Sequence, residues 1–428
     1  MAEASATAAA ENLSTRSRVV PLLAVAAAAF VVLVARRPEA LFRSEFSFES
    51  GSVFYAGTYF GSIPEILFRP YAGYQHLLAR LISFAERLVP VQLAPLMSHL
   101  LVLALIAGLA ALIASDRMKS AVPNQGARIA LAGLLVVLPN VQESAGVVGD
   151  VQRYIPIYLL LISLVPAPRT RPGRVLELGF LAVISVSGLF AALMQPLFWW
   201  RSWRKRDRYS LSIVAILAVG SVIQLLSIAL DGRHPANLAE PITLLRIWAF
   251  RDVVGALIGQ TMSYQAVTAG IPLLIGGMVT VGLAILLVRL WWKALPSLPR
   301  AYVGFTWLVF ATTPFFAQTE GAGLMANPGA ANRYFLIPGA MAALVVAVAF
   351  VRLRRPPDRW LAVLAAVVLA IGIGGDLRLP ALPYQDWADR SACIGGPNPC
   401  VVPVFEPPTW DIVWPGSGGT WFQPRPGG

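Results

Sequence analysis

Charged side chains stand at the ends of long apolar stretches in this sequence, where they could act on a polar substrate. The six that we single out are Glu45, Glu49, Glu143, Asp150, Arg153 and Arg333. A carboxylate in such a position can take a proton from a hydroxyl group or hold a divalent cation. A guanidinium can bind a phosphate, because its planar fork of donors matches the phosphate oxygens. Proton transfer and phosphate binding are therefore the chemistry that the rest of the chain would have to position.

Glu45 and Glu49 belong to the loop that follows the first apolar stretch. Their spacing of four places both carboxylates on one face of a helix, and in an extended segment they also share a side. We therefore expect the two carboxylates to lie together. The alternative is that both are solvated loop acids without a catalytic role.

Helical periodicity resumes later in the same loop, from residue 77 to residue 88. Apolar residues recur at helical spacing with Arg80, Glu86 and Arg87 between them, which predicts a helix lying along the outer membrane surface. His76 stands at the start of this helix. It either touches a substrate or packs against the helix and caps it.

A second polar strip, residues 139–154, contains Glu143, Asp150 and Arg153. Spacings of seven and three place the three side chains on one face of a helical connection that points into an outer cavity. The alternative is an internal ion pair between Asp150 and Arg153. Arg333 stands before a later apolar stretch, where it suits a lipid-linked phosphate or diphosphate, or else anchors that stretch by reaching to the interface.

Composition identifies the class of protein that must position these residues. The chain has 428 residues, of which 57% are hydrophobic and only 13% are charged, and its mean hydropathy is +0.66. Soluble domains contain about 25% charged residues, and about 20 consecutive apolar residues match the ~30 Å hydrocarbon core of a bilayer. These values exclude an ordinary soluble enzyme and predict an all-α polytopic membrane protein.

We expect about eleven transmembrane segments, with interfacial helices in the outer loops. The eleven ranges are 19–35, 94–114, 127–139, 151–166, 175–186, 189–200, 209–230, 267–287, 301–317, 334–351 and 360–375. The pair at 175–186 and 189–200 is too short to cross a bilayer upright and is expected to form a hairpin buried against other helices.

The distribution of charge predicts how these segments are oriented. Alternate loops hold 20 of the 34 Lys and Arg residues, including all three lysines, and the other loops hold 16 of the 22 acids. Basic loops are typical of the cytoplasmic side, so the net charge of +12 reflects topology and no nucleic-acid partner is needed. A bacterial inner membrane fits this pattern, with the N-terminus in the cytoplasm and the C-terminus outside.

Three regions follow from this topology. We expect a disordered cytoplasmic N-terminus at 1–18, a transmembrane domain at 19–375 whose first outer loop is 36–93, and an extracytoplasmic tail at 376–428. Cys393 and Cys400 lie in this tail and are expected to form a disulfide, because the compartment is oxidising and the segment between them is short. The Trp-rich tail is either a small cap on the membrane surface or a flap that binds an acceptor.

Several catalytic motifs are absent from the sequence. It has no closely spaced His and Cys cluster for a metal, no Gly-rich phosphate loop followed by Lys and no Gly-x-Ser-x-Gly elbow. Chemistry that uses cytosolic ATP is therefore not expected.

The order of these parts resembles the C-type (GT-C) glycosyltransferase superfamily, and within it a poorly characterised bacterial branch of polytopic proteins. The similar segments are Phe48–Phe54, Pro70–Tyr74, Pro139–Glu143, Ser187–Pro196 and Arg333–Phe335. These short segments occur in the same order as in the family, between residues 40 and 340. The family often has an acidic pair in the first loop, and here the pair is replaced by Glu49 followed by Ser50.

The resemblance implies a function. GT-C enzymes move a sugar from a polyprenyl-phosphate carrier to an acceptor on the outer face, and an acid in the first loop acts as base or metal ligand. By that resemblance Glu49 is the catalytic candidate and Glu45 the reserve. The residues expected to bind substrate are Arg333, Arg153, Asp150, Glu143, His76 and Tyr74. Among them, Arg333 is expected to bind the phosphate of the carrier. A divalent cation, Mg²⁺ or Mn²⁺, is left open by the missing acidic pair.

We therefore expect a glycosyltransferase that passes the sugar to a cell-envelope glycan, lipid or protein by a single inverting displacement. One alternative is a flippase or transporter for lipid-linked saccharides, in which the same charged groups line a translocation path. The other is a non-catalytic subunit of a cell-envelope complex.

Overall fold

The chain is mostly helical in the computed structural model, which describes residues 20–231, 240–269, 273–312, 327, 330–404, 410–416 and 419. The segment 1–18, for which we expected disorder, lies outside these residues. The helices of the first half are α2 (Ile63–Leu67), α3 (Leu77–Glu86), α4 (Ala94–Ala114), α5 (Gln125–Val136), α6 (Ile155–Leu164), α7 (Arg171–Ser185), α8 (Phe190–Lys205) and α9 (Arg208–Asp231). Those of the second half are α10 (Pro241–Ile247), α11 (Gly255–Thr268), α12 (Leu273–Ala294), α13 (Ser297–Thr312), α15 (Leu336–Arg352), α16 (Pro356–Asp376) and α17 (Trp387–Arg390).

Four helices among the described residues are long and apolar enough to cross a membrane. They are Val91–Ala114, Arg208–Asp231, Ile275–Ala294 and Pro356–Asp376. Shorter apolar helices are Val20–Arg36, Gln125–Val136, Val151–Leu164 and Leu336–Arg352. The structure therefore supports a helical membrane protein. Helices occupy most of the described part of each of the eleven predicted segments, and the number of crossings beyond these four stays a prediction.

Local sequence signals explain several helix starts. The Asn124 side chain caps α5 by accepting a hydrogen bond from the Ala127 amide, and Thr170 caps α7 by accepting one from Gly173. Proline in the first turn of α4, α6, α7 and α16 favours helix entry, because its fixed φ suits that position. Between α7 and α8 the chain breaks at Gly188, whose φ of +83° favours glycine.

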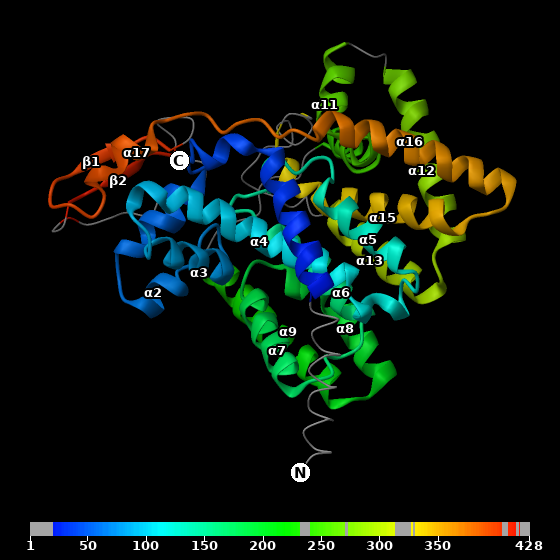
Figure 1. Ribbon diagram of the computed structural model, residues 1–428, viewed down its shortest axis with the longest axis horizontal. Coiled ribbons are helices and arrows are strands. Elements are labelled where there is room, and N and C mark those ends of the chain that lie inside the picture. The colour runs from blue at the N-terminus through cyan, green and yellow to red at the C-terminus, as the bar shows by residue number, and fades with distance from the viewer. Residues whose placement is uncertain are drawn as a thin grey trace.

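The helices pack as neighbouring pairs rather than as one parallel bundle. α4 lies on α5, α8 on α9, α11 on α16, and α12 on α15, as Figure 1 shows. The short pair α7 and α8 packs on α9, as the predicted buried hairpin would. Many apolar side chains of α9 are exposed, among them Leu211, Val219, Val222, Leu225 and Leu226, which suits a helix that faces lipid.

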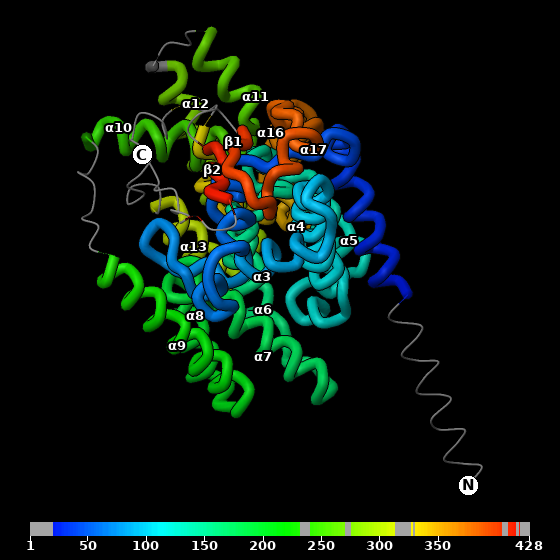
Figure 2. The backbone as a smooth tube through the Cα atoms, turned by 90° about the vertical axis from the view of Figure 1, so that its left-hand side faces the viewer, coloured from blue at the N-terminus to red at the C-terminus, as the bar shows by residue number. Residues whose placement is uncertain are grey.

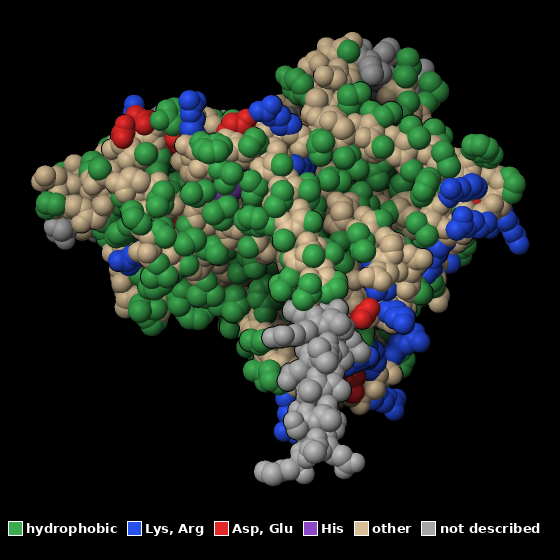
Figure 3. Space-filling view, in the orientation of Figure 1, with side chains coloured by type: hydrophobic (Ala, Val, Ile, Leu, Met, Phe, Trp, Pro, Cys, Tyr) green, Lys and Arg blue, Asp and Glu red, His purple; other side chains and the backbone are tan. Residues whose placement is uncertain are grey.

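Charged groups are unevenly distributed over the surface. Lys and Arg side chains gather toward the right and lower right of the face in Figure 3, around the end where α15 and α16 meet. The arginines that follow α15 include Arg352, Arg354 and Arg355, and all three are exposed. Acids are visible in the same view along the top, beside further basic side chains, and a few lie within the lower-right group.

Helix α3 forms as predicted, and its place along the membrane surface stays a prediction. Its Arg80 and Glu86 side chains are fully buried. Arg80 donates a hydrogen bond of 2.9 Å to the Val53 carbonyl oxygen, and its guanidinium lies 4.9 Å from the centre of the Phe54 ring. A π-helical turn, Ser50–Tyr55, packs over α3 and covers Arg80.

The C-terminal tail packs on the first outer loop. Its disulfide between Cys393 and Cys400 is confirmed, and the tail contains a hairpin of β1 (Cys400–Val402) and β2 (Ile412–Trp414). Trp387 is buried against the rings of Phe46 and Tyr55. Figure 2 shows the hairpin and α17 beside the start of the chain's outer loop and α4. Of the two alternatives for the tail, the structure favours a cap, and the surface that it caps is the loop carrying Glu49.

Candidate functional site

One end of each of three helices lies at a polar cluster: α5 ends near it, and α6 and α15 begin near it. Glu143 and Asp150 lie in the connection that follows α5, Arg153 lies in the single turn before α6, and Arg333 lies in the turn before α15. The connection forms a series of turns rather than the predicted helix, so sequence spacing does not align these side chains. They meet instead because α5, α6 and α15 pack side by side.

Arg333 joins the acids of the cluster. Its guanidinium lies 3.2 Å from the Glu143 carboxylate and 3.8 Å from the Asp150 carboxylate. Arg153 lies 3.5 Å from Asp150, so the predicted internal ion pair is present, but it is one part of a larger network. The Arg333 side chain is 17% exposed, which does not fit an anchor that reaches out to the interface.

Burial sets the electrostatics of this network. It raises the pKa of Asp150 to about 7, although the arginines Arg333 and Arg153 favour the charged form and oppose that rise. The carboxylates of Glu49 and Glu143 raise the pKa of Asp150 further, because like charges disfavour ionisation. Asp150 and its neighbouring carboxylates also raise the pKa of Arg333. Arg333 therefore stays charged in a site that is largely closed to water.

Tyr334 is a residue that sequence reasoning missed as a site member. The guanidinium of Arg153 lies 4.4 Å from the centre of its ring and that of Arg333 lies 5.3 Å away. Both arginines are therefore held over one aromatic face, where cation–π attraction keeps them close despite their like charge. The adjacency of Arg333 and Tyr334 was the only sequence signal.

Buried arginines outside the cluster position its segments. Arg251 donates to the Ala330 carbonyl and the Asn332 side chain, both at 2.8 Å, and so holds the turn that carries Arg333. Arg37 donates to the carbonyl oxygens of Gln142 and Ala145 on the connection that carries Glu143. Neither role could be predicted from the sequence, because a guanidinium that binds carbonyl oxygens far away in the chain leaves no local sequence pattern.

Glu49 approaches the cluster from the first outer loop. A Cβ built on Gly149 would lie 3.0 Å from the Glu49 Cγ and 3.2 Å from its Oε1, so this side chain passes over the residue before Asp150. The Ser50 hydroxyl accepts a hydrogen bond of 3.3 Å from the Gly149 amide and holds the two segments together. The Glu49 carboxylate is half-buried and makes no hydrogen bond or ion pair with the residues that the structure describes. It remains available for a substrate.

Glu45 has different surroundings, so the expectation that it lies with Glu49 is wrong. Its carboxylate is buried and accepts a hydrogen bond of 3.2 Å from the Trp387 amide in the tail. Phe48, with a φ of +46°, reverses the chain between the two acids, and such a reversal cannot be read from their spacing. Glu45 thus anchors the tail to the loop.

Tyr74 and His76 line the side of the cluster formed by the first loop. Their rings stack with centres 4.5 Å apart; His76 is buried and Tyr74 is half-buried. Burial raises the pKa of Tyr74 to about 12 and lowers that of His76 to about 3, so both stay neutral. The Nε2 of His76 faces the Tyr71 carbonyl at 3.1 Å and must carry the proton, since a carbonyl only accepts. Its Nδ1 has no hydrogen-bond partner among the described residues.

The acids of the cluster do not form a metal site. Within the part of the chain that the structure describes, no group of three or more His, Cys, Asp or Glu side chains is arranged to hold an ion. Arg333 occupies the space between Glu143 and Asp150, where a cation would otherwise lie. The arrangement suits an anion that replaces a carboxylate as the partner of these arginines.

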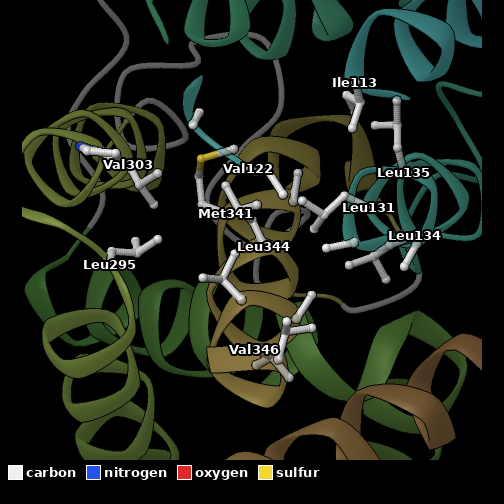
Figure 4. A pocket seen from close by; sticks show the side chains of 18 of the residues that line it. Ile113, Val122, Leu131, Leu134, Leu135, Leu295, Val303, Met341, Leu344 and Val346 are labelled. Carbon is white, nitrogen blue, oxygen red and sulfur yellow. The ribbon is translucent and has the colours of Figure 1, made fainter. Parts of the chain in front are cut away.

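An apolar cavity of about 420 Å³ lies alongside the same three helices, with lining residues that run from Leu138, Ile157 and Ala340 to Asn124, Pro296 and Arg352. We call it the α5–α15 cavity. Figure 4 shows Leu131, Leu134 and Leu135 of α5 on one side and Met341 and Leu344 of α15 on the other. Ile157, Leu160 and Leu161 of α6 also line it, together with residues of α13 and α16. The polar cluster therefore stands at the ends of helices whose sides border a space for hydrocarbon.

Comparison with protein-family models, curated proteins and solved structures found no match for this chain. The function has to be argued from the site alone.

Proposed function

We propose that the protein is a membrane glycosyltransferase that moves a sugar from a polyprenyl-phosphate carrier to a hydroxyl group at the outer face. The resemblance to GT-C enzymes suggests this reaction. One observation supports this function most directly: Arg153 and Arg333 stand immediately before α6 and α15. Both of these helices line the α5–α15 cavity. A carrier lipid needs this combination of a cationic site for its phosphate and an apolar space for its chain.

The mechanism is a single displacement at the anomeric carbon. Glu49 removes the proton of the acceptor hydroxyl, whose oxygen forms the new bond to the anomeric carbon. The bond from that carbon to the carrier phosphate breaks at the same time. The phosphate leaves with the electron pair and is stabilised by Arg333 and Arg153, so the configuration of the sugar inverts.

The neighbours of Glu49 fit the role of general base. The Glu49 carboxylate is close to Arg333, which will gain an anionic partner, and Glu49 has no partner of its own in the described part of the chain. Glu143 and Asp150 occupy the arginines when no substrate is present. Protonation of Asp150, whose pKa burial raises, would release Arg153 and Arg333 toward the phosphate.

A transfer assay tests this function. The purified protein in lipid vesicles is offered radiolabelled polyprenyl-phosphate sugars and cell-envelope acceptors, and the Glu49→Gln variant is compared with Glu65→Gln. Glu65 is an exposed acid of the same loop, and Gln keeps its capping box with Ser62, so it is a matched control. Transfer by the wild type and Glu65→Gln, with loss in Glu49→Gln, supports the proposal. Movement of labelled carrier lipid across the vesicle without transfer would favour the flippase instead.

A further inference from the structure

A second cavity of about 410 Å³ lies on the other flank of α6. We call it the α4–α7 cavity, because α4 and α7 face each other across it. Leu105, Gly108 and Leu112 line it from α4, at the spacing of one helix face, and Tyr154 and Tyr158 line it from the α6 side. The stretch of α4 from Ala104 to Leu112 gives this wall a length of about 12 Å at 1.5 Å per residue.

The outer end of this cavity lies at the polar cluster. Val151 and Tyr154 line the cavity and bracket Arg153 in sequence. Leu78 lines it two residues after His76, and its amide donates a hydrogen bond of 2.8 Å to the Ser187 hydroxyl. The α4–α7 cavity therefore reaches the segment that carries Arg153, and the α5–α15 cavity lies on the other side of α6, where Ile157, Leu160 and Leu161 line it.

The other boundaries of the α4–α7 cavity fit a hydrocarbon chain that enters from the bilayer. Leu176 of its wall is 74% exposed and Gly108 is exposed, so the cavity opens sideways toward lipid. At its inner end Arg117 pairs with Glu177, and the Tyr209 hydroxyl also donates to Glu177. This network closes the cavity toward the cytoplasmic end of α4.

We propose that the acceptor is itself a lipid, whose chain occupies the α4–α7 cavity and whose head group presents its hydroxyl to Glu49. The inference rests on the proposed function and specifies its acceptor. A soluble glycan or a polypeptide would need no second apolar space at the cluster, whereas two lipid substrates need two. Arg153, which lies between Val151 and Tyr154 of the cavity wall, complements the phosphate group that such a lipid carries.

A cavity-filling substitution tests this inference. A Cβ added at Gly108 meets no atom within 4 Å, so Gly108→Leu extends into the α4–α7 cavity without a clash. Gly133 on α5 is the matched control, because it is also an exposed helical glycine with no atom within 4 Å and does not line either cavity. Both substitutions raise helix propensity equally, so they differ only in what the new side chain fills.

The assay offers a radiolabelled polyprenyl-phosphate sugar together with total lipid extracted from membranes that lack the protein. We expect a new labelled lipid from the wild type and from Gly133→Leu. In Gly108→Leu we expect a KM for the extracted lipid about tenfold higher, equivalent to ~1.4 kcal/mol, with unchanged release of free sugar to water in the absence of acceptor.

Two results would overturn the inference while leaving the proposed function intact. One is equal acceptor kinetics in Gly108→Leu and Gly133→Leu, which would mean that bulk membrane lipid fills the cavity. The other is labelled sugar that accumulates only in the delipidated glycan or protein fraction. If the wild type neither transfers sugar nor releases it from any donor, the proposed function itself is wrong.

Discussion

Asp150 provides a prediction that tests the polar cluster without knowledge of the substrate. Burial raises the pKa of Asp150 to about 7, from an ordinary value of 3.8 for an aspartate. The folded protein therefore binds the proton of this carboxyl group more tightly than the unfolded chain does. The proton therefore stabilises the fold at low pH, and this contribution is lost as the pH rises from about 4 through about 7. The substitution Asp150→Asn removes this titrating group and with it the dependence on pH.

The size of the effect follows from the pKa. One unit corresponds to about 1.36 kcal/mol, so between pH 5 and pH 8 Asp150 lowers the free energy of unfolding by about 3 kcal/mol. A chain of 428 residues has an unfolding entropy of about 0.9 kcal/mol/K, which converts this change to about 3 °C in Tm. Other groups titrate in both proteins and cancel in the difference.

The assay is thermal unfolding of the wild type and Asp150→Asn in one detergent from pH 5 to pH 8. We expect the Tm of the wild type to fall by about 3 °C more than that of the variant over this range. The Asn side chain is neutral at every pH, so the prediction concerns only the difference in slope between the two proteins. Parallel pH profiles for the two proteins would refute the argument that Asp150 is protonated by burial.

Two further predictions concern how the site is held together. Trp387→Ala removes a fully buried side chain between the tail and the loop that carries Glu49. We expect the packing of the tail on this loop to lose about 3–5 kcal/mol of stability, so that protease cleaves the tail rapidly. Trp387→Phe should be cleaved more slowly. Gly146→Ala places a Cβ 1.9 Å from the His99 ring at a φ of +81°, so we expect a Tm several degrees lower, whereas Gly133→Ala leaves the Tm unchanged or higher.

Each of these has a clear contrary result. Resistance of the Trp387→Ala tail to protease would mean that the tail does not depend on this side chain for its place on the loop. A Gly146→Ala protein with the Tm of the wild type would mean that the connection between α5 and α6 relaxes easily, and that the cluster on it is not rigidly positioned.

The sequence predicted the elements well, because apolar length and capping residues are local signals. Helices fall on the predicted ranges, and the pairing of Cys393 with Cys400 followed from their short separation.

The candidate site was predicted in its members more than in its geometry. Glu143, Asp150, Arg153 and Arg333 do lie together, as expected for charged groups at neighbouring helix ends. Their contacts depend on which helices are neighbours, and nothing in a single sequence shows that α15 brings Arg333 to α6.

Departures from the expected arrangement arose where tertiary packing or backbone reversal decided the outcome. Glu45 parted from Glu49 because Phe48 takes a left-handed conformation between them. Helix α3 has an amphipathic pattern typical of a membrane surface, yet Arg80 and Glu86 are buried, and Arg80 donates to a carbonyl oxygen more than twenty residues earlier in the chain. A periodic pattern shows which face is charged but not what covers it.

The most direct test of the central claim is the fate of a polyprenyl-phosphate sugar bound to the Glu49→Gln variant. We predict that this variant binds the donor with the affinity of the wild type, since Arg153 and Arg333 are intact, but forms less than about 1% of the product in the same time, as expected for loss of a general base. Glu65→Gln should bind and react like the wild type. Wild-type turnover by Glu49→Gln would contradict the account.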